Sequence, residues 1–261
     1  MRPVLIAAAV WAASALSSGE QTLPDAEIYV LGEVHDNPAH HDVQADLTSQ
    51  IAPVALVLEM LTPSQAEAGQ DAARDDETAL ATALGWANSG WPDFALYAPI
   101  FAAAPEATLF GAALERPVLM DAMSEGAAAT FGMEADQYGL APLSPEDQAA
   151  REEEQAIAHC NALPAEMLPG MVEVQRLRDA AFARTAIEAF EVTGGPVVVI
   201  TGTGHARADY GVPAYIRAAR PDITVFTLGQ VEGDEAYPDT LFDMVIRTDP
   251  TPREDPCAVF Q

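Results

Sequence analysis

The sequence predicts an α/β protein with a mostly parallel central sheet, flanking helices and a helical cap insertion. Several short segments are almost wholly apolar, and segments with helical spacing lie between them. A continuous apolar run is typical of a strand covered on both faces, and alternation of strands with helices is typical of a parallel sheet. The chain has 261 residues, of which 49 % are apolar, so it can bury a sizeable core.

Six segments are interpreted as strands. The three clearest are Glu27–Glu33, Val54–Glu59 and Pro196–Gly202, and the three weaker ones are Ala107–Ala112, Ile223–Leu228 and Leu241–Ile246. Helices are expected at His41–Ile51, Glu77–Ala87, Asp93–Ala103, Pro145–Leu163 and Met171–Val192. In the first helix, apolar residues recur every four positions and therefore share one face. Residues 62–168 contain few strand signals, so we expect a helix-rich cap there.

The first fifteen residues differ in kind from the rest of the chain. Arg2 precedes a short apolar run that ends in Ala13-Ser14-Ala15, and this order is typical of a secretory signal peptide. We expect cleavage after Ala15, one domain over residues 16–261, and an exported protein in the periplasm or outside the cell. An uncleaved membrane anchor is the alternative. No cysteine follows the apolar run, so no lipid anchor is expected.

The charge and the two cysteines indicate which partners to exclude and which covalent bond to expect. Twelve basic residues, all arginine, face 40 acidic ones, and a net charge of −28 disfavours a nucleic-acid partner. Cys160 and Cys257 are the two cysteines. In an oxidising compartment they are expected to form a disulfide, with two free thiols as the alternative. His159, on a helix rich in glutamate, is expected at the surface.

Chemically versatile side chains follow the three clear strands. Glu33 and His35 follow the first strand, Glu59 ends the second, and His205 follows the third. Sites in open parallel sheets form beyond the carboxyl ends of the strands, so these four side chains are expected to converge. They are candidate catalytic residues and candidate ligands of a divalent metal. The alternative for each is a structural role, such as capping the following helix.

Polar residues near this edge are further candidates. Gln175, Arg178 and Asp179 lie on a polar helix face that either borders the pocket or is solvated. Arg207 lies two residues beyond His205, and its guanidinium could bind a carboxylate through two hydrogen bonds. If the cluster binds no metal, we expect it to hold Arg207 instead.

Four segments together resemble a known family. They read LGEVHDNPAHHDVQ at Leu31–Gln44, LVLEM at Leu56–Met60, QRLRDAAFA at Gln175–Ala183 and GTGHARADYGVPAYI at Gly202–Ile216. In this order they are similar to the ChaN-like proteins, which are haem-binding, iron-regulated envelope proteins of bacteria. That family belongs to a wider group that includes the Tiki proteases and erythromycin esterase.

The resemblance implies haem or iron-porphyrin binding in iron uptake. Members of the family can hold two stacked haems across a dimer with tyrosine ligation, so a homodimer is expected. Tyr210 and Tyr97 are then candidate ligands. Gln175, Arg178 and Arg207 are candidate cofactor-binding residues, and the two arginines would have to balance the propionates in a strongly anionic protein.

The wider group implies a second function, a metal-dependent hydrolase of the Tiki type. Such a site uses paired Gly-x-x-His motifs together with glutamates. Here the motifs are Gly32–His35 and Gly202–His205, and the acidic partners are Glu33 and Glu59.

Overall fold

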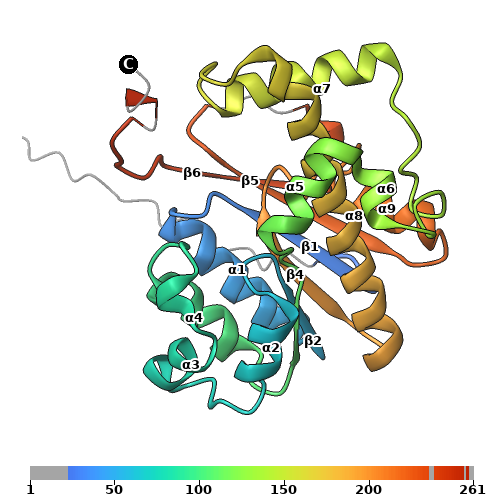
Figure 1. The fold of residues 1–261 in the computed structure, drawn as a ribbon. Helices are drawn as coiled ribbons and strands as arrows, with labels where there is room; N and C mark the ends of the chain where they lie inside the picture. The colour runs from blue at the N-terminus through green and yellow to red at the C-terminus, as the bar shows by residue number, and fades with distance from the viewer. Residues whose placement is uncertain (1–22, 235–237, 256, 259–261) are drawn as a thin grey trace, which may run out of the picture.

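The computed structural model describes residues 23–234, 238–255 and 257–258, so the expected signal peptide lies outside the described residues. Within them, six strands form one sheet in the order β3-β2-β4-β1-β5-β6 (Figure 1). The strands are β1 (Ile28–Glu33), β2 (Ala55–Leu58), β3 (Thr108–Gly111), β4 (Val197–Gly202), β5 (Val225–Glu232) and β6 (Met244–Thr248). All neighbouring strands are parallel. The predicted fold class and the six predicted strands are confirmed.

Helices connect the strands. They are α1 (Pro38–Ile51), α2 (Pro63–Gly69), α3 (Glu77–Ala83), α4 (Phe94–Ala103), α5 (Arg116–Glu125), α6 (Ala127–Phe131), α7 (Pro145–Ala158), α8 (Leu168–Thr193) and α9 (Val212–Ala219). Single 3-10 turns occur at η1 (Trp86–Asn88), η2 (Ala165–Met167) and η3 (Asp239–Leu241). The five expected helices are present, with shifted ends. α7 stops at Ala158 because Cys160 and Asn161 adopt positive φ angles of 59° and 54°.

The sheet is covered on both faces. Tyr29 and Leu31 of β1 pack with α1, α2, α3 and α4, whereas Ile28 and Val30 pack with α5, α6, α8 and α9. Figure 1 shows these two groups of helices on opposite sides of the strands. Every residue of β1 is buried, which explains why the strand is apolar up to its final residue, Glu33, rather than alternating.

Residues 62–168, expected as a helix-rich cap, supply helices to both faces of the sheet and also its edge strand β3. α7 differs from the other helices of this segment because it buries none of its residues, and it packs against α8. Among the residues that the structure describes, no helix is both long and apolar enough to cross a bilayer.

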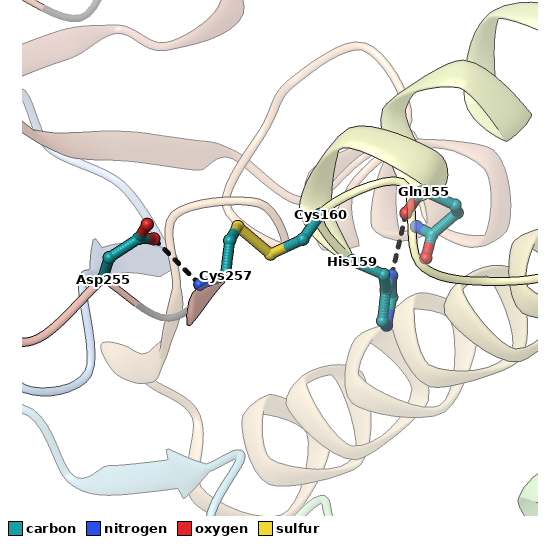
Figure 2. The surroundings of a disulfide bond; sticks show 5 residues. All are labelled: Gln155, His159, Cys160, Asp255 and Cys257. Atoms are coloured by element: carbon teal, nitrogen blue, oxygen red, sulfur yellow. Dashed lines mark hydrogen bonds between the residues drawn. A yellow bond between two sulfur atoms is a disulfide. The ribbon is translucent and has the colours of Figure 1, made fainter. Parts of the chain in front are cut away.

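The predicted disulfide is confirmed. Cys160, two residues after α7, is bonded to Cys257, which lies 97 positions later in the chain (Figure 2). The bond attaches the segment after β6 to the end of α7. It therefore fixes a part of the chain that little apolar packing holds in place.

Candidate functional site

The carboxyl ends of β1, β2 and β4, together with α8, carry a group of ionisable side chains, called here the strand-end cluster: Glu33, His35, Glu59, Asp179 and His205. All of them are buried except His35, whose side chain is 40 % exposed. Glu33, at the end of β1, points toward α4. Its Oε1 accepts hydrogen bonds from the Tyr97 hydroxyl and from Nδ1 of His35, each at 2.9 Å. The His35 ring packs edge-on against Trp91, with the ring centres 4.7 Å apart.

Glu59 follows β2 and points toward α8, on the opposite face of the sheet. Its carboxylate accepts from Arg178 at 2.5 Å, from the Thr201 hydroxyl at 2.6 Å and from the Gly202 N–H at 2.8 Å. Nε2 of His205 lies 3.6 Å from the same carboxylate. Each oxygen of Glu59 therefore has at least one donor.

His205 is held from α8. Its Nδ1 lies 2.6 Å from Oδ1 of Asp179 and 3.1 Å from the side-chain amide of Gln175. Asp179 lies four residues after Gln175, on the same face of α8, so helical spacing already placed it near that side chain. Asp179 was expected on the polar face of this helix, but its contact with His205 was not predicted.

Gly202 is the point where the two halves of the cluster meet. A Cβ at this position would lie 3.0 Å from Cε1 of His35 and 3.8 Å from Oε2 of Glu59. The first motif glycine, Gly32, is equally confined, because its Cβ would lie 2.8 Å from the Cα of Thr203. The structure thus brings Glu33, His35, Glu59 and His205 together, while the roles assigned to them stay predictions.

The cluster shifts the pKa values of its members. Burial alone would raise the pKa of Glu59, but the charges of His205 and Arg178 outweigh it and lower the pKa to about 2. Burial opposes protonation of His35, yet the hydrogen bond to Glu33 and the charge of Glu59 raise its pKa. Glu59 is consequently a stable anion at neutral pH, paired with Arg178.

This arrangement does not fit the divalent metal that the sequence analysis considered. The donors listed above already occupy Glu59, and the Arg178 guanidinium supplies the positive charge there. No set of three or more histidine, cysteine or acidic side chains with metal-site geometry occurs in the part of the chain that the structure describes. The expectation that Arg207 would serve as the cluster's cation was wrong, because Arg178 has that position.

A cavity of about 680 Å³ lies beside the cluster, between α7, α8 and the loop after β4. We call it the α7 cavity. Its apolar part comes from Ile157, Ala158 and Val172, and its polar part includes Arg151, Glu154, His159, Gln175, Arg207 and Tyr210. Gln175 touches both the cavity and His205, so the two regions are contiguous.

The side chains at one end of the α7 cavity form a stack. Arg151 and Arg207 both lie over the Tyr210 ring, with their guanidinium carbons 4.3 and 3.8 Å from its centre. The Tyr210 hydroxyl donates to Glu154, which also pairs with Arg207 at 3.2 Å. Arginine is suited to such stacking on an aromatic face while its N–H groups still bind anions.

Two residues have surroundings that the sequence did not predict. His159, expected at the surface, is half-buried and lines the α7 cavity. Tyr97 is fully buried, lies outside that cavity, and donates its hydroxyl to Glu33. Burial raises the pKa of Tyr97, and the charge of Glu33 raises it further.

A second hollow, of about 430 Å³, lies at the amino-terminal edge of the sheet, with Asp25 and Glu27 in its wall. Ligand sites of open parallel sheets form at the other edge, where the cluster and the α7 cavity lie.

Comparison with solved structures supports the fold. The structure titled "Cofacial heme binding to ChaN of Campylobacter jejuni" matches with a TM-score of 0.60 and 20 % identity, covering 84 % of this chain and 86 % of that one. The type III effector HopBA1 matches at a TM-score of 0.47 and 13 % identity, over 86 % and 88 % of the two chains. A mutant of erythromycin esterase EreC matches at 0.40 and 9 %, over 79 % and 70 %. No protein with a curated description matches this chain.

Comparison with protein families shows which family the chain belongs to. The profile described as "Haem-binding uptake, Tiki superfamily, ChaN" matches residues 20–216, which include the strand-end cluster and every side chain named above in the α7 cavity. The resemblance inferred from the four sequence segments is confirmed. The chain belongs to the ChaN family of haem-binding uptake proteins, within the Tiki superfamily.

Proposed function

We propose that this protein binds haem or a related iron-porphyrin in the α7 cavity and acts in iron uptake. The observation that carries the proposal is the cavity itself. It combines an apolar wall with two stacked arginines in a protein whose net charge is −28. A volume of about 680 Å³ is within the range of ligand sites, roughly 300–1,000 Å³.

The chemistry of the lining residues suits a flat apolar ligand with two carboxylates. Ile157, Ala158 and Val172 would contact the macrocycle, and Arg151 and Arg207 would receive the propionates. When bound, the group would supply an iron centre that a protein side chain can ligate. Of the predicted cofactor-binding residues, Arg207, Gln175 and Tyr210 line this cavity, whereas Arg178 is engaged by Glu59 and Tyr97 by Glu33.

A substitution that fills the cavity tests the proposal. Gly204 lines the cavity, and a Cβ there would meet no atom within 4 Å, so Gly204→Trp can occupy the space without a backbone clash. Haemin added to the unaltered protein should shift the Soret band, and Gly204→Trp should weaken binding at least about tenfold. Met133→Trp is the control, because Met133 is fully exposed and lies outside the cavity. An unaltered protein without a Soret shift would refute haem binding.

Export and dimer formation belong to the same proposal. The composition of the first fifteen residues supports a cleaved leader and an envelope location. Intact mass of the protein from its native host should be smaller by these residues. Sedimentation with and without haemin tests a homodimer, which the family resemblance implies.

A hydrolase is the second candidate, and the two carboxylate–histidine pairs of the cluster favour it. Glu33 holds Nδ1 of His35, and Asp179 holds Nδ1 of His205. Such pairs orient an imidazole for general-base work. Ester and peptide substrates should be tested with the unaltered protein and His35→Ala, with and without added metal. Absence of any turnover that depends on His35 would exclude this candidate.

A further inference from the structure

We propose that the disulfide between Cys160 and Cys257 is a redox latch on the α7 cavity. The intact bond holds the carboxyl-terminal end of α7 in place. When a dithiol reduces the bond, this end of α7 is released, the cavity opens and its ligand leaves. Release of the ligand rests on the haem binding proposed above, whereas release of α7 does not depend on it.

The segment that carries α7 is held without a buried side chain of its own. Leu140 and Val172 are each 1 % exposed, and of the residues between them, all of which the structure describes, none is buried. Midway along α7, Glu154 contacts Arg207 and Tyr210, but its side chain is largely exposed. Exposed polar contacts of this kind contribute little to stability. The end of α7 therefore depends on the covalent bond that follows it.

The chain beyond β6 is the other partner of the bond. Residues 249–255 and 257–258, called here the C-terminal strap, also contain no buried residue. Arg253 attaches the strap to the sheet. Its guanidinium donates to both oxygens of Glu232, at the end of β5, at 2.6 and 2.7 Å, and to both oxygens of Asp36, in the loop after β1, at 2.8 and 2.9 Å. The hydrogen bonds from Arg253 are the main reason why the pKa of Glu232 falls to about 2, so this attachment is charged at neutral pH.

The strap thus links the sheet to α7. Arg253 holds it at the sheet, and Cys257, four positions later, holds it to Cys160 (Figure 2). Breaking the S–S bond leaves the ion pairs of Arg253 in place, so the strap stays at the sheet and α7 is the part that is released. Residues 157–159, directly before Cys160, all line the α7 cavity. Their release removes one wall of the cavity.

The bond is open to chemical reduction, because Cys160 and Cys257 are both partly exposed. A thiolate of the dithiol attacks one sulfur, the S–S bond breaks, and the other sulfur leaves as a thiolate that takes up a proton. The second thiol of the reductant loses its proton and displaces the mixed disulfide. Two electrons have then passed to the protein, which gains two thiols, and the dithiol has become a disulfide.

Hydrogen exchange of the full chain without haemin tests the release of α7. Amides of α7 should exchange at least about tenfold faster in the reduced protein than in the oxidised one, because the helix opens locally. Low concentrations of urea should not change this rate, whereas they should accelerate exchange in β1, which opens only when the whole domain unfolds. Cys160→Ser/Cys257→Ser should exchange as the reduced protein does and should not respond to dithiothreitol.

Two arginine variants test the strap in the oxidised protein. Arg253→Gln keeps the disulfide but detaches the strap from the sheet, so it should also accelerate exchange in α7. Arg220→Gln is the matched control, because Arg220 likewise pairs with two carboxylates, neither of which belongs to α7 or the strap. It should exchange as the unaltered protein does. Equal exchange of α7 in Arg253→Gln and in the control would overturn the role of the strap.

Release of the ligand is measured on protein that has been reduced with dithiothreitol and freed of it by gel filtration without oxygen. Haemin should transfer to apomyoglobin at least about tenfold faster from the reduced protein than from the oxidised one. Equal exchange of α7 in both redox states would overturn the latch, whatever binds in the cavity, and so would equal haemin transfer. If the oxidised protein shows no Soret shift with haemin, haem binding fails, and hydrogen exchange still decides whether α7 is released.

Discussion

The strand-end cluster and the α7 cavity lie at the same edge of the sheet but hold their charges differently. In the cluster, Glu59 is 2 % exposed and has donors from three residues around its carboxylate. In the cavity, the Glu154 side chain is 46 % exposed and pairs with Arg207, which is itself paired with Asp209. Both regions contain an Arg–Glu pair, and the two pairs differ at the carboxylate: Glu59 is almost fully shielded although Arg178 is 29 % exposed, whereas Glu154 is in contact with water.

This difference in exposure means that the cluster contributes mainly to stability, whereas the cavity is accessible to a ligand. A buried charge that loses its partner is costly, whereas an exposed ion pair contributes little because water replaces either partner. The cluster is therefore suited to hold β1, β2, β4 and α8 in register. The cavity can exchange its internal ion pairs for a ligand at small cost. The motif residues that identify the family lie mainly in the first region, and the ligand we propose lies in the second.

The largest expected effect comes from breaking the buried pair. Glu59→Gln should lower the free energy of unfolding by roughly 3–5 kcal/mol, because it removes the charge that faces Arg178 and His205. Glu154→Gln should change it by at most about 1 kcal/mol, since its pair with Arg207 is exposed. Urea unfolding of both variants measures the difference. Equal losses of unfolding free energy would mean that both ion pairs contribute equally to stability despite their different exposure.

Removal of the disulfide should have the next largest effect on stability, and it should affect the cavity more than the cluster. The double variant Cys160→Ser/Cys257→Ser should lose roughly 2–4 kcal/mol of unfolding free energy, because the bond joins residues 97 positions apart. It should also weaken haemin binding, since it frees the end of α7 that carries His159.

Tryptophan fluorescence of the folded double variant reports on the strand-end cluster. Trp91 packs against His35, so its emission should stay as in the unaltered protein. A changed emission with unchanged haemin affinity would show that the disulfide supports the cluster rather than the cavity.

Much of the cluster could be predicted from sequence because it depends on local patterns. Continuous apolar runs predicted β1, β2 and β4, and parallel strands bring their carboxyl ends to one edge. The meeting of Glu33, His35, Glu59 and His205 follows from these two facts. Which arginine would join them did not follow, because Arg178 reaches Glu59 across 119 positions through the packing of α8.

The cavity was harder to predict for a related reason. The position of His159 depends on where α7 ends, and that end depends on the positive φ angles of Cys160 and Asn161. Neither residue is a glycine, so the sequence gives no strong stop signal there. A glutamate-rich helix is normally solvated on all sides, and only its packing against α8 makes one side a cavity wall.

The dependence of stability on pH tests the contribution of a buried histidine, His40. His40 is fully buried, its Nδ1 accepts from the Val34 N–H, and burial lowers its pKa from 6.5 to about 4. A lowered pKa means that the unfolded chain binds the proton more readily. The stabilisation is therefore complete above pH 6.5 and is lost as the pH falls toward 4, an effect on the order of 2–3 kcal/mol.

The measurement is the difference between the unaltered protein and His40→Gln, by urea unfolding at several pH values. The difference should shrink as the pH falls from 6.5 to 4. The raised pKa of His35 acts in the opposite direction, stabilising the fold at low pH, and it is present in both proteins. A difference that does not vary with pH would show that His40 has the same pKa in the folded and unfolded states.

The smallest effect is expected from alanine at two neighbouring glycines: Gly202, the last residue of β4, beside the cluster, and Gly204, in the loop that follows, at the α7 cavity. A Cβ at Gly202 would lie 3.0 and 3.2 Å from two atoms of the His35 ring, so Gly202→Ala must displace that ring. We expect a loss of roughly 1–3 kcal/mol, as for overpacking of a dense core. At Gly204 a Cβ would meet nothing within 4 Å, so Gly204→Ala should stay within about 0.5 kcal/mol of the unaltered protein. Thermal unfolding of the two variants shows whether Gly202 is tightly packed and Gly204 has open space beside it. A Gly204→Ala variant as unstable as Gly202→Ala would mean that the cavity is closed in solution, and the site proposed for haem would then have no entrance on this side.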